Sequence, residues 1–432
     1  MSGAGALAIT RLLLGEAEFT PEAGRVLLKK IRDPVTNELV DRALVTYFRA
    51  PHSFTGEDVV EISCHGSPLV LRRVTDIVLK LDGRLAGPGE FSLRALSNRK
   101  LNLSQAEAIR DLINAQTDAA ANQAIRQMNG EVSNRVRPIK ERLVRLIVPL
   151  ESALEFVEDD LPAIQLEEMK RELVDILCEV TRLAATFQAG HLLRDGVKVT
   201  IVGRPNVGKS SLFNRLLGID RAIVTEIPGT TRDTVQEQIA INGIPVLLTD
   251  TAGVRKSNDP IEMMGVERTR RAMAEADLLI VVVDGTAKLS AEDFEFLERT
   301  SEGKRVIALN KEDLPGFEDP FVGKVSGGEN VFPVAAKTGT GFEELHEAIL
   351  EAFGVSYASG DQLLITDARH YDLLCRTDAE LERALKLLSE RASEEFSLAH
   401  LYNGLRLLGE ITGETTTEDI LAKIFSTFCI GK

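Results

Sequence analysis

A glycine-containing motif near the middle of the chain restricts its fold more than any other feature. It reads GRPNVGKS, from Gly203 to Ser210, and matches the pattern G-x-x-x-x-G-K-S. An apolar, β-branched run precedes it and a helical pattern follows it. In such a strand–loop–helix unit, backbone N–H groups surround phosphate oxygens, Lys209 neutralises the β and γ oxygens, and Ser210 can ligate Mg²⁺. The sequence therefore predicts a site for a nucleoside triphosphate with Mg²⁺.

Three later motifs occur in the order that a GTPase needs. DTAG begins at Asp250, which can hold Mg²⁺ through water, and ends at Gly253, whose N–H can meet the γ-phosphate. NKED ends at Asp313, whose carboxylate can accept hydrogen bonds from N1–H and N2–H of guanine. AAK, residues 335–337, resembles the loop that supports the base. Because adenine has no proton on N1, the motifs favour GTP over ATP.

The stretch TEIPGTTRD lies between the phosphate loop and Asp250. One of its threonines is expected to complete the Mg²⁺ shell and to close over the γ-phosphate as a switch, and Thr231 is the better candidate. The predicted Mg²⁺ ligands are therefore Ser210 and Thr231. The predicted GTP-binding residues are Asn206, Val207, Gly208, Lys209, Ser210, Ser211, Thr225, Glu226, Ile227, Pro228, Gly229, Thr230, Thr231, Asp250, Thr251, Ala252, Gly253, Asn310, Lys311, Asp313, Ala335, Ala336 and Lys337.

The group that orients the attacking water is not evident from these motifs. Ras-like enzymes use a glutamine directly after the Asp-x-x-Gly element. This chain has Val254 at that position, and valine cannot form the hydrogen bond. Glu262 and Arg255 stand out in the stretch that follows. A charged residue in a helical stretch is more often a solvated surface group, but the missing glutamine favours a replacement.

The chain has 432 residues, which is too long for a single hydrophobic core. Short apolar runs and turns predict an N-terminal α/β domain over residues 1–100. Strands and helices alternate over residues 191–356, which predicts a Ras-like P-loop G domain with a doubly wound parallel sheet. Helical patterns on either side predict one discontinuous helical domain, residues 101–190 and 357–432, into which the G domain is inserted. Two separate helical domains are the less economical alternative.

Composition argues against several other classes of protein. No apolar run reaches the roughly 18 residues that span a bilayer, and no basic segment with an apolar core follows Met1, so a cytoplasmic location without a membrane partner is expected. The four cysteines are far apart, which argues against a disulfide framework or a zinc site. A net charge of -15 argues against binding nucleic acid by phosphate neutralisation alone. A nucleic-acid substrate would need a local basic patch or a partner protein.

The segment EISCHGS places a cysteine next to a histidine in the first domain. Neighbouring side chains of an extended strand point to opposite faces, so Cys64 and His65 are poorly placed to form a nucleophile–base pair. A turn around HGS with a hydrogen-bonded histidine is the favoured interpretation.

Seven segments along the chain are similar to the MnmE/TrmE family of tRNA-modifying GTPases, and the resemblance covers nearly the whole sequence. The matching segments are GRPNVGKSS, GTTRD, DTAGVR with IEMMGVER, NKED, YFRAPHSFTGEDVVEISCHG, GPGEFSLRALSNRKLNLSQAEA and the terminal CIGK. The resemblance implies a homodimer whose G domains meet across their nucleotide faces when K⁺ binds. It places the K⁺-binding residues at Asn206, Thr225, Ile227 and Thr230.

The resemblance also implies how hydrolysis is catalysed. The K⁺ would supply the charge that an arginine finger supplies elsewhere, a contribution of roughly 10³ to 10⁵ in rate for the arginine case. The family's catalytic glutamate falls on Glu262, which would act through a bridging water. Arg255 would then be a switch residue and not the finger.

The first domain resembles the part of the family that binds 5-formyltetrahydrofolate or a related one-carbon folate at the homodimer interface. The family's ligand contacts fall on Arg11, Glu61, Lys100 and Lys432. A carboxylate suits the amide-like edge of a pterin, and basic side chains suit its glutamate tail. Family members usually begin with an additional strand before the segment that matches GALAITRL, whereas this chain starts almost at that segment.

The implied function is modification of the wobble uridine (U34) of tRNA to 5-carboxymethylaminomethyluridine, or to an aminomethyl form. The implied partner is an MnmG/GidA-like flavoprotein that uses FAD and NADH, assembles with this chain as a heterotetramer and supplies much of the tRNA surface. A regulatory or ribosome-assembly GTPase without one-carbon transfer is the rival hypothesis, because the G-domain motifs are shared by both.

The chain ends in FSTFCIGK, which fits a lipid-attachment box poorly. Thr415 and Glu418 form a plausible capping box for a helix whose apolar face includes Phe425, and this helix would end near Cys429. The resemblance implies that CIGK lies by the folate site, with Lys432 as a ligand contact and Cys429 as a candidate thiol for the modification step. A packed, unreactive Cys429 remains the alternative.

Overall fold

The computed structural model describes nine parts of the chain: residues 1–155, 163–220, 235–250, 271–301, 303–321, 330–354, 363–390, 394–414 and 425. Two compact units are present. The first comprises Met1–Arg110, Gln127–Lys140 and Leu405–Lys432, and the second comprises Asp111–Arg126 and Glu141–Gly404. Within the described ranges, no helix combines the length and the apolar character needed to span a bilayer.

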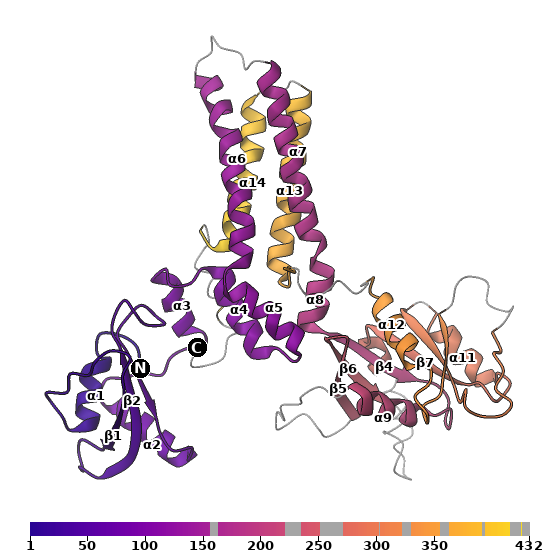
Figure 1. The fold of residues 1–432 in the computed structure, drawn as a ribbon, viewed down its shortest axis with the longest axis horizontal. Coiled ribbons are helices and arrows are strands. Elements are labelled where there is room, and N and C mark those ends of the chain that lie inside the picture. The colour runs from indigo at the N-terminus through magenta and orange to yellow at the C-terminus, as the bar shows by residue number, and fades with distance from the viewer. Residues whose placement is uncertain are drawn as a thin grey trace. The chain divides into compact units, whose positions relative to one another are not determined.

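A three-stranded antiparallel sheet organises the N-terminal domain (Figure 1). Its strands are β1 (Val26–Arg32), β2 (Leu39–Phe48) and β3 (Val59–Ser63), in the order β1-β2-β3. Helices α1 (Ala6–Leu14) and α2 (Pro68–Lys80) pack against it. The predicted α/β character of this region follows from these elements.

The buried face of this sheet comes from alternation along β2. Ala43, Val45 and Tyr47 are buried at every second position, as expected for a strand with one face toward a core. They pack with Leu13 of α1 and Ile31 of β1, both fully buried. Hydrophobic burial on this single face holds the two helices on the sheet.

Helix α3 (Glu90–Ser97) is held by an ion network at its first residue. Glu90 accepts hydrogen bonds from Arg84, at 2.5 Å, and from Arg94, at 2.7 Å, and Arg94 also pairs with Glu57 at 2.8 Å. The hydrogen bond from Arg84 is the main reason that the pKa of Glu90 falls from 4.5 to about 2. Since the folded-state pKa is depressed, this carboxylate stabilises the fold above about pH 4.5 and loses that contribution as the pH falls toward 2.

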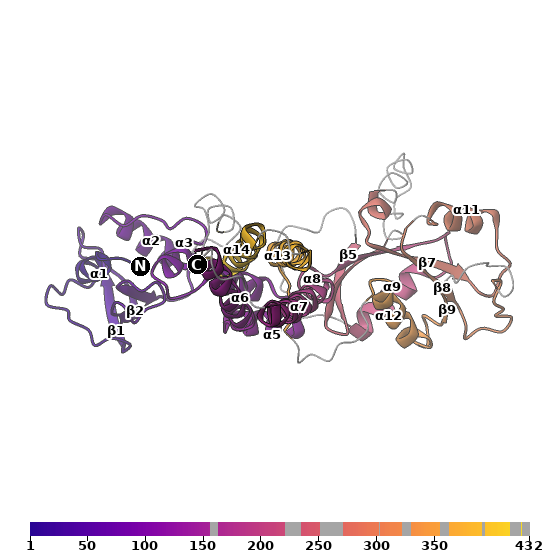
Figure 2. The ribbon, with the colours of Figure 1, turned by 90° about the horizontal axis from the view of Figure 1, so that it is seen from above.

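Four long helices lie side by side in both views (Figures 1 and 2). Their bounds are α6 (Glu131–Glu155), α7 (Ala163–Ala185), α13 (Ala368–Ser389) and α14 (Glu394–Thr412). Three shorter helices are α4 (Leu103–Asn114), α5 (Asp118–Met128) and α8 (Phe187–Asp195). The long helices come from segments before and after the G domain in sequence, as a single discontinuous helical domain requires. The exact domain boundaries stay a prediction.

Side-chain contacts join helices that follow one another in the sequence. Arg142 of α6 pairs with Glu172 and Glu179 of α7, each at 2.6 Å, and His400 of α14 contacts Glu380 of α13 at 2.7 Å. Helices α6 and α7 carry fully buried leucine and isoleucine side chains, namely Leu143, Leu150, Leu173 and Ile176. Phe425, predicted on an apolar helical face, is buried against Leu103 and Ala106 of α4.

A six-stranded sheet in the order β5-β6-β4-β7-β8-β9 forms the centre of the G domain. Every neighbouring pair is parallel except β5 and β6. The element bounds are β4 (Val197–Val202), α9 (Lys209–Asp220), β5 (Val235–Ile241), β6 (Ile244–Asp250), β7 (Leu278–Asp284), α11 (Ala291–Arg299), β8 (Arg305–Asn310), β9 (Val331–Val334) and α12 (Phe342–Glu351).

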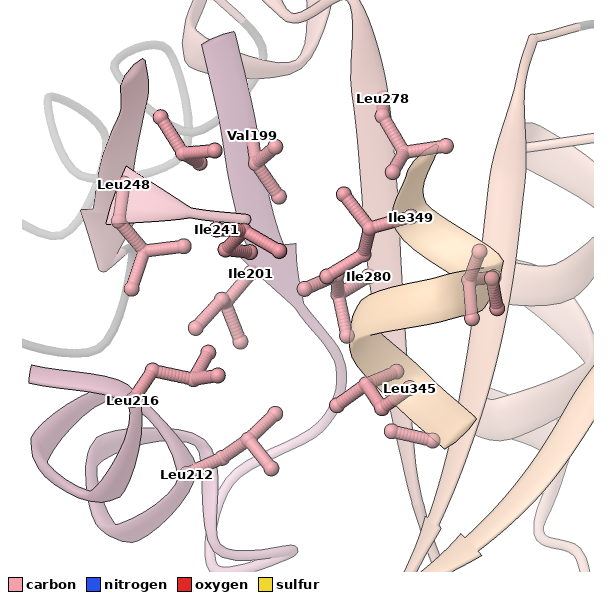
Figure 3. Close-up of a cluster of buried hydrophobic side chains, with 14 of the residues drawn as sticks. Val199, Ile201, Leu212, Leu216, Ile241, Leu248, Leu278, Ile280, Leu345 and Ile349 are labelled. Atoms are coloured by element: carbon pink, nitrogen blue, oxygen red, sulfur yellow. The ribbon is translucent and has the colours of Figure 1, made fainter. Parts of the chain in front are cut away.

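Helices cover both faces of this sheet. Leu212 and Leu216 of α9 and Leu345 of α12 pack with Val199 and Ile201 of β4 on one face (Figure 3). On the other face, a second apolar cluster includes side chains of β7, β8 and α11. The arrangement agrees with the predicted doubly wound fold and brings the carboxyl ends of β4, β6, β7 and β8 to one edge.

The antiparallel edge strand β5 departs from the predicted parallel sheet. A turn of only two residues, Asn242 and Gly243, connects β5 to β6. Their φ angles are 50° and 82°, as a tight hairpin turn needs. A parallel connection requires a crossover of a dozen residues or more, so two residues can only join antiparallel strands.

Candidate nucleotide-binding site

The phosphate loop connects the end of β4 to the start of α9. Two of its glycines have backbone angles that favour glycine, with φ of 143° at Gly203 and 101° at Gly208. A Cβ at Gly203 would lie 2.5 Å from the carbonyl oxygen of Val282, and one at Gly208 would lie 2.2 Å from Nδ2 of Asn310. Both close contacts explain why this strand–loop–helix unit needs glycine at these positions.

Lys209 and Ser210 stand at the first turn of α9, as the motif predicts. The Lys209 ammonium donates to the carbonyl oxygens of Gly203 at 2.8 Å and Arg204 at 2.7 Å, so the side chain folds back across the loop. The Ser210 hydroxyl donates to Oδ2 of Asp250 at 3.0 Å. The structure thus places the Ser210 hydroxyl next to the Asp250 carboxylate, and both groups were predicted to hold Mg²⁺, the carboxylate through water.

The oxygen donors fit a magnesium ion. Mg²⁺ prefers hard oxygen ligands and is usually bound by one or two protein groups together with phosphates and water. Ser210 and the buried carboxylate of Asp250 are donors of this kind, and they lie beside a helix N-terminus that favours phosphate. The site is therefore suited to Mg²⁺ carried by a nucleotide.

Asn310 links the phosphate loop to the loop that supports the base. It lies at the end of β8, where its Nδ2 donates to the carbonyl oxygen of Val207 at 2.9 Å. Its Oδ1 accepts from the backbone N–H of Ala336 at 3.1 Å. The buried amide of Asn310 therefore connects the end of β8 with the phosphate loop and with the loop that supports the base.

The remaining base-site residues flank this amide. Asp313 is exposed three residues beyond the end of β8, where its carboxylate can meet a ligand. Ala335 and Ala336 are buried, whereas Lys337 is exposed.

The other predicted GTP-binding residues belong to the phosphate loop and to α9. Within the phosphate loop, Val207 is buried, and Asn206 is exposed with φ of 65°. Ser211 is exposed on α9.

Asp284 belongs to this site but was not among the predicted residues. It ends β7 and contacts Nζ of Lys311 at 2.5 Å, while Thr286 donates to its other oxygen at 2.7 Å. Burial raises the pKa of Asp284, but the hydrogen bonds from Lys311 and Thr286 outweigh it and leave the pKa below its usual value. The signal in the sequence was an acidic residue that ends a strand with only apolar residues before it, VVVD.

Asp284→Asn is expected to weaken GTP binding about five- to tenfold with little change in kcat, because the Lys311 ammonium would lose a charged partner. Titration calorimetry with GTP measures the affinity. Glu298→Gln, which neutralises an exposed carboxylate on α11, is the control and should leave affinity unchanged. Unaltered affinity in Asp284→Asn would show that the Asp284–Lys311 pair does not support the nucleotide site.

Several predicted residues lie outside the described part of the chain. From the switch and the K⁺ site these are Thr225, Glu226, Ile227, Pro228, Gly229, Thr230 and Thr231. From the segment after β6 they are Thr251, Ala252, Gly253, Val254, Arg255 and Glu262. From the C-terminus they are Thr415, Glu418, Cys429 and Lys432.

The predicted folate residues of the first domain contact different neighbours. Nε of Arg11 donates to the carbonyl oxygen of Phe19 at 2.9 Å, and Nζ of Lys100 donates to that of Pro51 at 3.1 Å. Glu61 is exposed on β3. A cavity of about 530 Å³ next to β3, α1 and α2 is lined mainly by apolar side chains, and these three residues are not part of its lining. The folate assignment therefore stays a prediction.

His65 pairs with an acidic neighbour in the first domain. Its Nδ1 lies 2.7 Å from Oδ1 of Asp41, and the carbonyl oxygen of His65 accepts from Ser67 N–H in a turn after β3. Burial and, to a smaller extent, Asp41 raise the pKa of the Cys64 thiol. These contacts favour the turn interpretation over a nucleophile–base pair.

The sheet order, the phosphate loop and the Asn-Lys-x-Asp segment at the end of β8 together define a P-loop GTPase. Comparison with known families extends this assignment beyond the G domain. Residues 103–429 match the family described as MnmE helical domain, and residues 1–100 match the family described as GTP-binding protein TrmE N-terminus. The chain belongs to the MnmE family of tRNA modification GTPases.

Individual relatives match along most of their length. A tRNA modification GTPase MnmE from Koribacter versatilis (strain Ellin345) is 44% identical over 430 residues, covering 99% of this chain and 93% of the relative. One from Aquifex aeolicus (strain VF5) is 43% identical over 396 residues, covering 91% and 88%. Among solved structures, the G domain of the T. maritima FeoB iron transporter is 28% identical with a TM-score of 0.28, covering 36% of this chain and 98% of that one.

Proposed function

We propose that this chain is a K⁺-dependent GTPase that helps to form 5-carboxymethylaminomethyluridine at the wobble position (U34) of tRNA. The observation that carries the GTPase part is the Asn310 amide, which ties the phosphate loop to the base loop beside Asp313. The relatives named tRNA modification GTPase, aligned with up to 99% of the chain, support the tRNA part.

The proposed reaction is hydrolysis of GTP. Lys209 and the N–H groups at the start of α9 hold the phosphates, Ser210 and Asp250 hold the Mg²⁺ of the nucleotide, and Asp313 selects guanine. Bound K⁺ would supply positive charge at the transferring phosphoryl group. We assign its binding to Asn206, Thr225, Ile227 and Thr230. The exposed, left-handed Asn206 in the phosphate loop supports this assignment.

The proposed one-carbon step uses 5-formyltetrahydrofolate or a related folate in a homodimer. Arg11, Glu61, Lys100 and Lys432 are the proposed ligand contacts, and Cys429 is the proposed thiol. Phe425, four residues before Cys429 in the sequence, is buried against Leu103 and Ala106.

A second protein is expected to complete the modification. With a net charge of -15, this chain is poorly suited to bind tRNA by phosphate neutralisation alone. An MnmG/GidA-like flavoprotein that provides FAD and the basic surface would meet this need in a heterotetramer.

Deletion of Ile430–Lys432 tests the proposed function. GTP hydrolysis by the purified protein should stay within about twofold, because the nucleotide site lies elsewhere in the sequence, whereas U34 modification in a complemented deletion strain should fall at least about tenfold. Mass analysis of tRNA nucleosides measures the modification. Cys429→Ser, with the full tail, separates a role of the thiol from that of Lys432.

Three results would contradict this proposal. Loss of GTP hydrolysis together with modification would mark the terminal segment as structural. Normal modification would remove the terminal residues from the reaction. A parental protein that hydrolyses GTP but shows no binding of 5-formyltetrahydrofolate at millimolar concentration would favour the assembly-GTPase hypothesis.

A further inference from the structure

The β5–β6 hairpin extends from the nucleotide site to the start of helix α5. Asp250, which accepts the Ser210 hydrogen bond, ends β6 and lies opposite Val235, the first residue of β5. The two strands are paired at all seven positions of each, from this end to Ile241 and Ile244 beside the turn. At about 3.4 Å per residue, the hairpin tip is on the order of 20 Å from Asp250.

The tip of the hairpin contacts the start of helix α5. The Thr117 hydroxyl donates to the carbonyl oxygen of Gly243 at 2.7 Å, and it accepts the backbone N–H of Ala120 at 3.1 Å as the cap of the helix. One hydroxyl therefore serves both the hairpin and the helix. Next to it, the side-chain amides of Gln238 on β5 and Gln116 are hydrogen-bonded.

The contact is tightly packed as well as hydrogen-bonded. A Cβ at Gly243 would lie 2.9 Å from Cβ of Ala119, so even one added carbon would disturb the interface. Gly243 has a φ of 82°, a left-handed backbone conformation that residues other than glycine rarely adopt. The tip is thus held in one position against α5.

The segment that contains Thr117 is anchored at a second point. Asp111, six residues earlier on α4, lies 3.3 Å from Nε of Arg194 on α8, and Arg194 also pairs with Asp367 at 3.0 Å. Arg194 is three residues before β4, the strand that leads into the phosphate loop. The α4–α5 corner, residues 111–120, therefore contacts both the hairpin and the helix that precedes the G domain.

We propose that Thr117 is a positioning residue that couples the nucleotide state to helix α5 through the β5–β6 hairpin. A paired hairpin is stiff along its length, so a displacement of Asp250 or of the start of β5 between GTP and GDP reaches the tip at Gly243. At the tip, the Thr117 hydroxyl is bonded to both Gly243 and Ala120, so the displacement also moves the first turn of α5. The inference rests on the proposed GTPase cycle and names the route by which that cycle reaches the helical domain.

Hydrogen exchange of the full-length protein tests this coupling. The chain is compared with bound GDP and with a non-hydrolysable GTP analogue, both with Mg²⁺ and K⁺, and exchange is followed in peptides from 118–126 and 235–250. We expect exchange rates in both peptides to differ at least about threefold between the two nucleotides. In Thr117→Val the difference should persist in 235–250 and disappear in 118–126, while GTP affinity stays unchanged.

Thr117→Ser is the matched control, because serine keeps the hydroxyl that caps the helix and contacts Gly243. It should respond as the parental protein does. A merely structural role of Thr117 would alter exchange equally in both nucleotide states and leave the difference between them in place, which would overturn the proposal. A parental protein whose 235–250 peptide responds while 118–126 does not would also overturn it.

Gly243→Ala alters the same contact from the hairpin side, and it tests the coupling if Thr117→Val fails to fold. The added methyl group presses on Ala119, so the response of 118–126 should again be lost with GTP binding retained. A retained response would reject the coupling. Failure of the parental protein to bind GTP at all would instead contradict the proposed function, and calorimetry of the parental protein separates the two cases.

Discussion

Asp313→Asn is expected to shift the nucleotide preference from GTP toward xanthosine triphosphate. The carboxylate of Asp313 can accept both N1–H and N2–H of guanine, whereas an asparagine amide offers one acceptor and one donor. Xanthine has an oxygen in place of the guanine amino group, so asparagine can accept its N1–H and donate to that oxygen. Because a site built for a specific hydrogen bond strongly rejects a base that leaves a polar group unpaired, kcat/KM for GTP should fall at least about 100-fold.

Steady-state hydrolysis of both nucleotides by the parental protein and the variant measures this change. Glu312→Gln, at the neighbouring position of the same motif, should retain the preference for GTP. If Asp313→Asn keeps its activity with GTP and gains none with xanthosine triphosphate, the base is recognised by another group and the assignment of Asp313 is wrong.

The parts of the site that the sequence could predict are those that chain order alone determines. Gly203 to Ser210 follow a β-branched run and precede a helical pattern, and strand–loop–helix geometry then fixes where Lys209 and Ser210 lie. Asp250 and Asn310 end apolar runs, and the carboxyl ends of parallel strands meet at one edge of a sheet. The 3.0 Å hydrogen bond between Ser210 and Asp250 lies at this edge.

The antiparallel strand β5 was not predicted, although signals for it are present. The sequence VQEQIAI alternates in polarity only weakly, and its apolar end is followed by Asn242 and Gly243, a pair typical of tight hairpins. The inner strands in IPVLLTD and ADLLIVVVD are almost entirely apolar because they are buried within the sheet. An edge strand is less buried, so its pattern is weaker than theirs.

Long-range polar contacts could not be predicted from the sequence. Thr117 and Gly243 are 126 positions apart, and Arg194 and Asp367 are 173 apart. Neither pair lies in a motif, and each forms only because packed helices and the hairpin bring the groups together. Asp284 is an intermediate case, since its position at a strand end was visible while its pairing with Lys311 depended on the adjacent strand.

Glu262→Ala is expected to reduce kcat for GTP about 10³-fold in K⁺ buffer, with GTP affinity within about twofold of the parental value, because a group that orients the attacking water acts in the transition state. Val254 stands where Ras-like enzymes have a glutamine, so this chain needs another group in that role. Glu262 is the proposed replacement. Single-turnover hydrolysis at saturating enzyme measures the chemical step separately from binding.

Comparison of K⁺ and Na⁺ buffers shows whether Glu262 and the cation act in the same step. The parental protein should be much slower in Na⁺, and Glu262→Ala should add a smaller loss there than in K⁺, because groups that act as a unit are non-additive. Glu267→Ala, five positions further along the same segment, should hydrolyse GTP at the parental rate. A Glu262→Ala variant with the parental rate in K⁺ would remove Glu262 from the reaction and leave Arg255 as the next candidate in that segment.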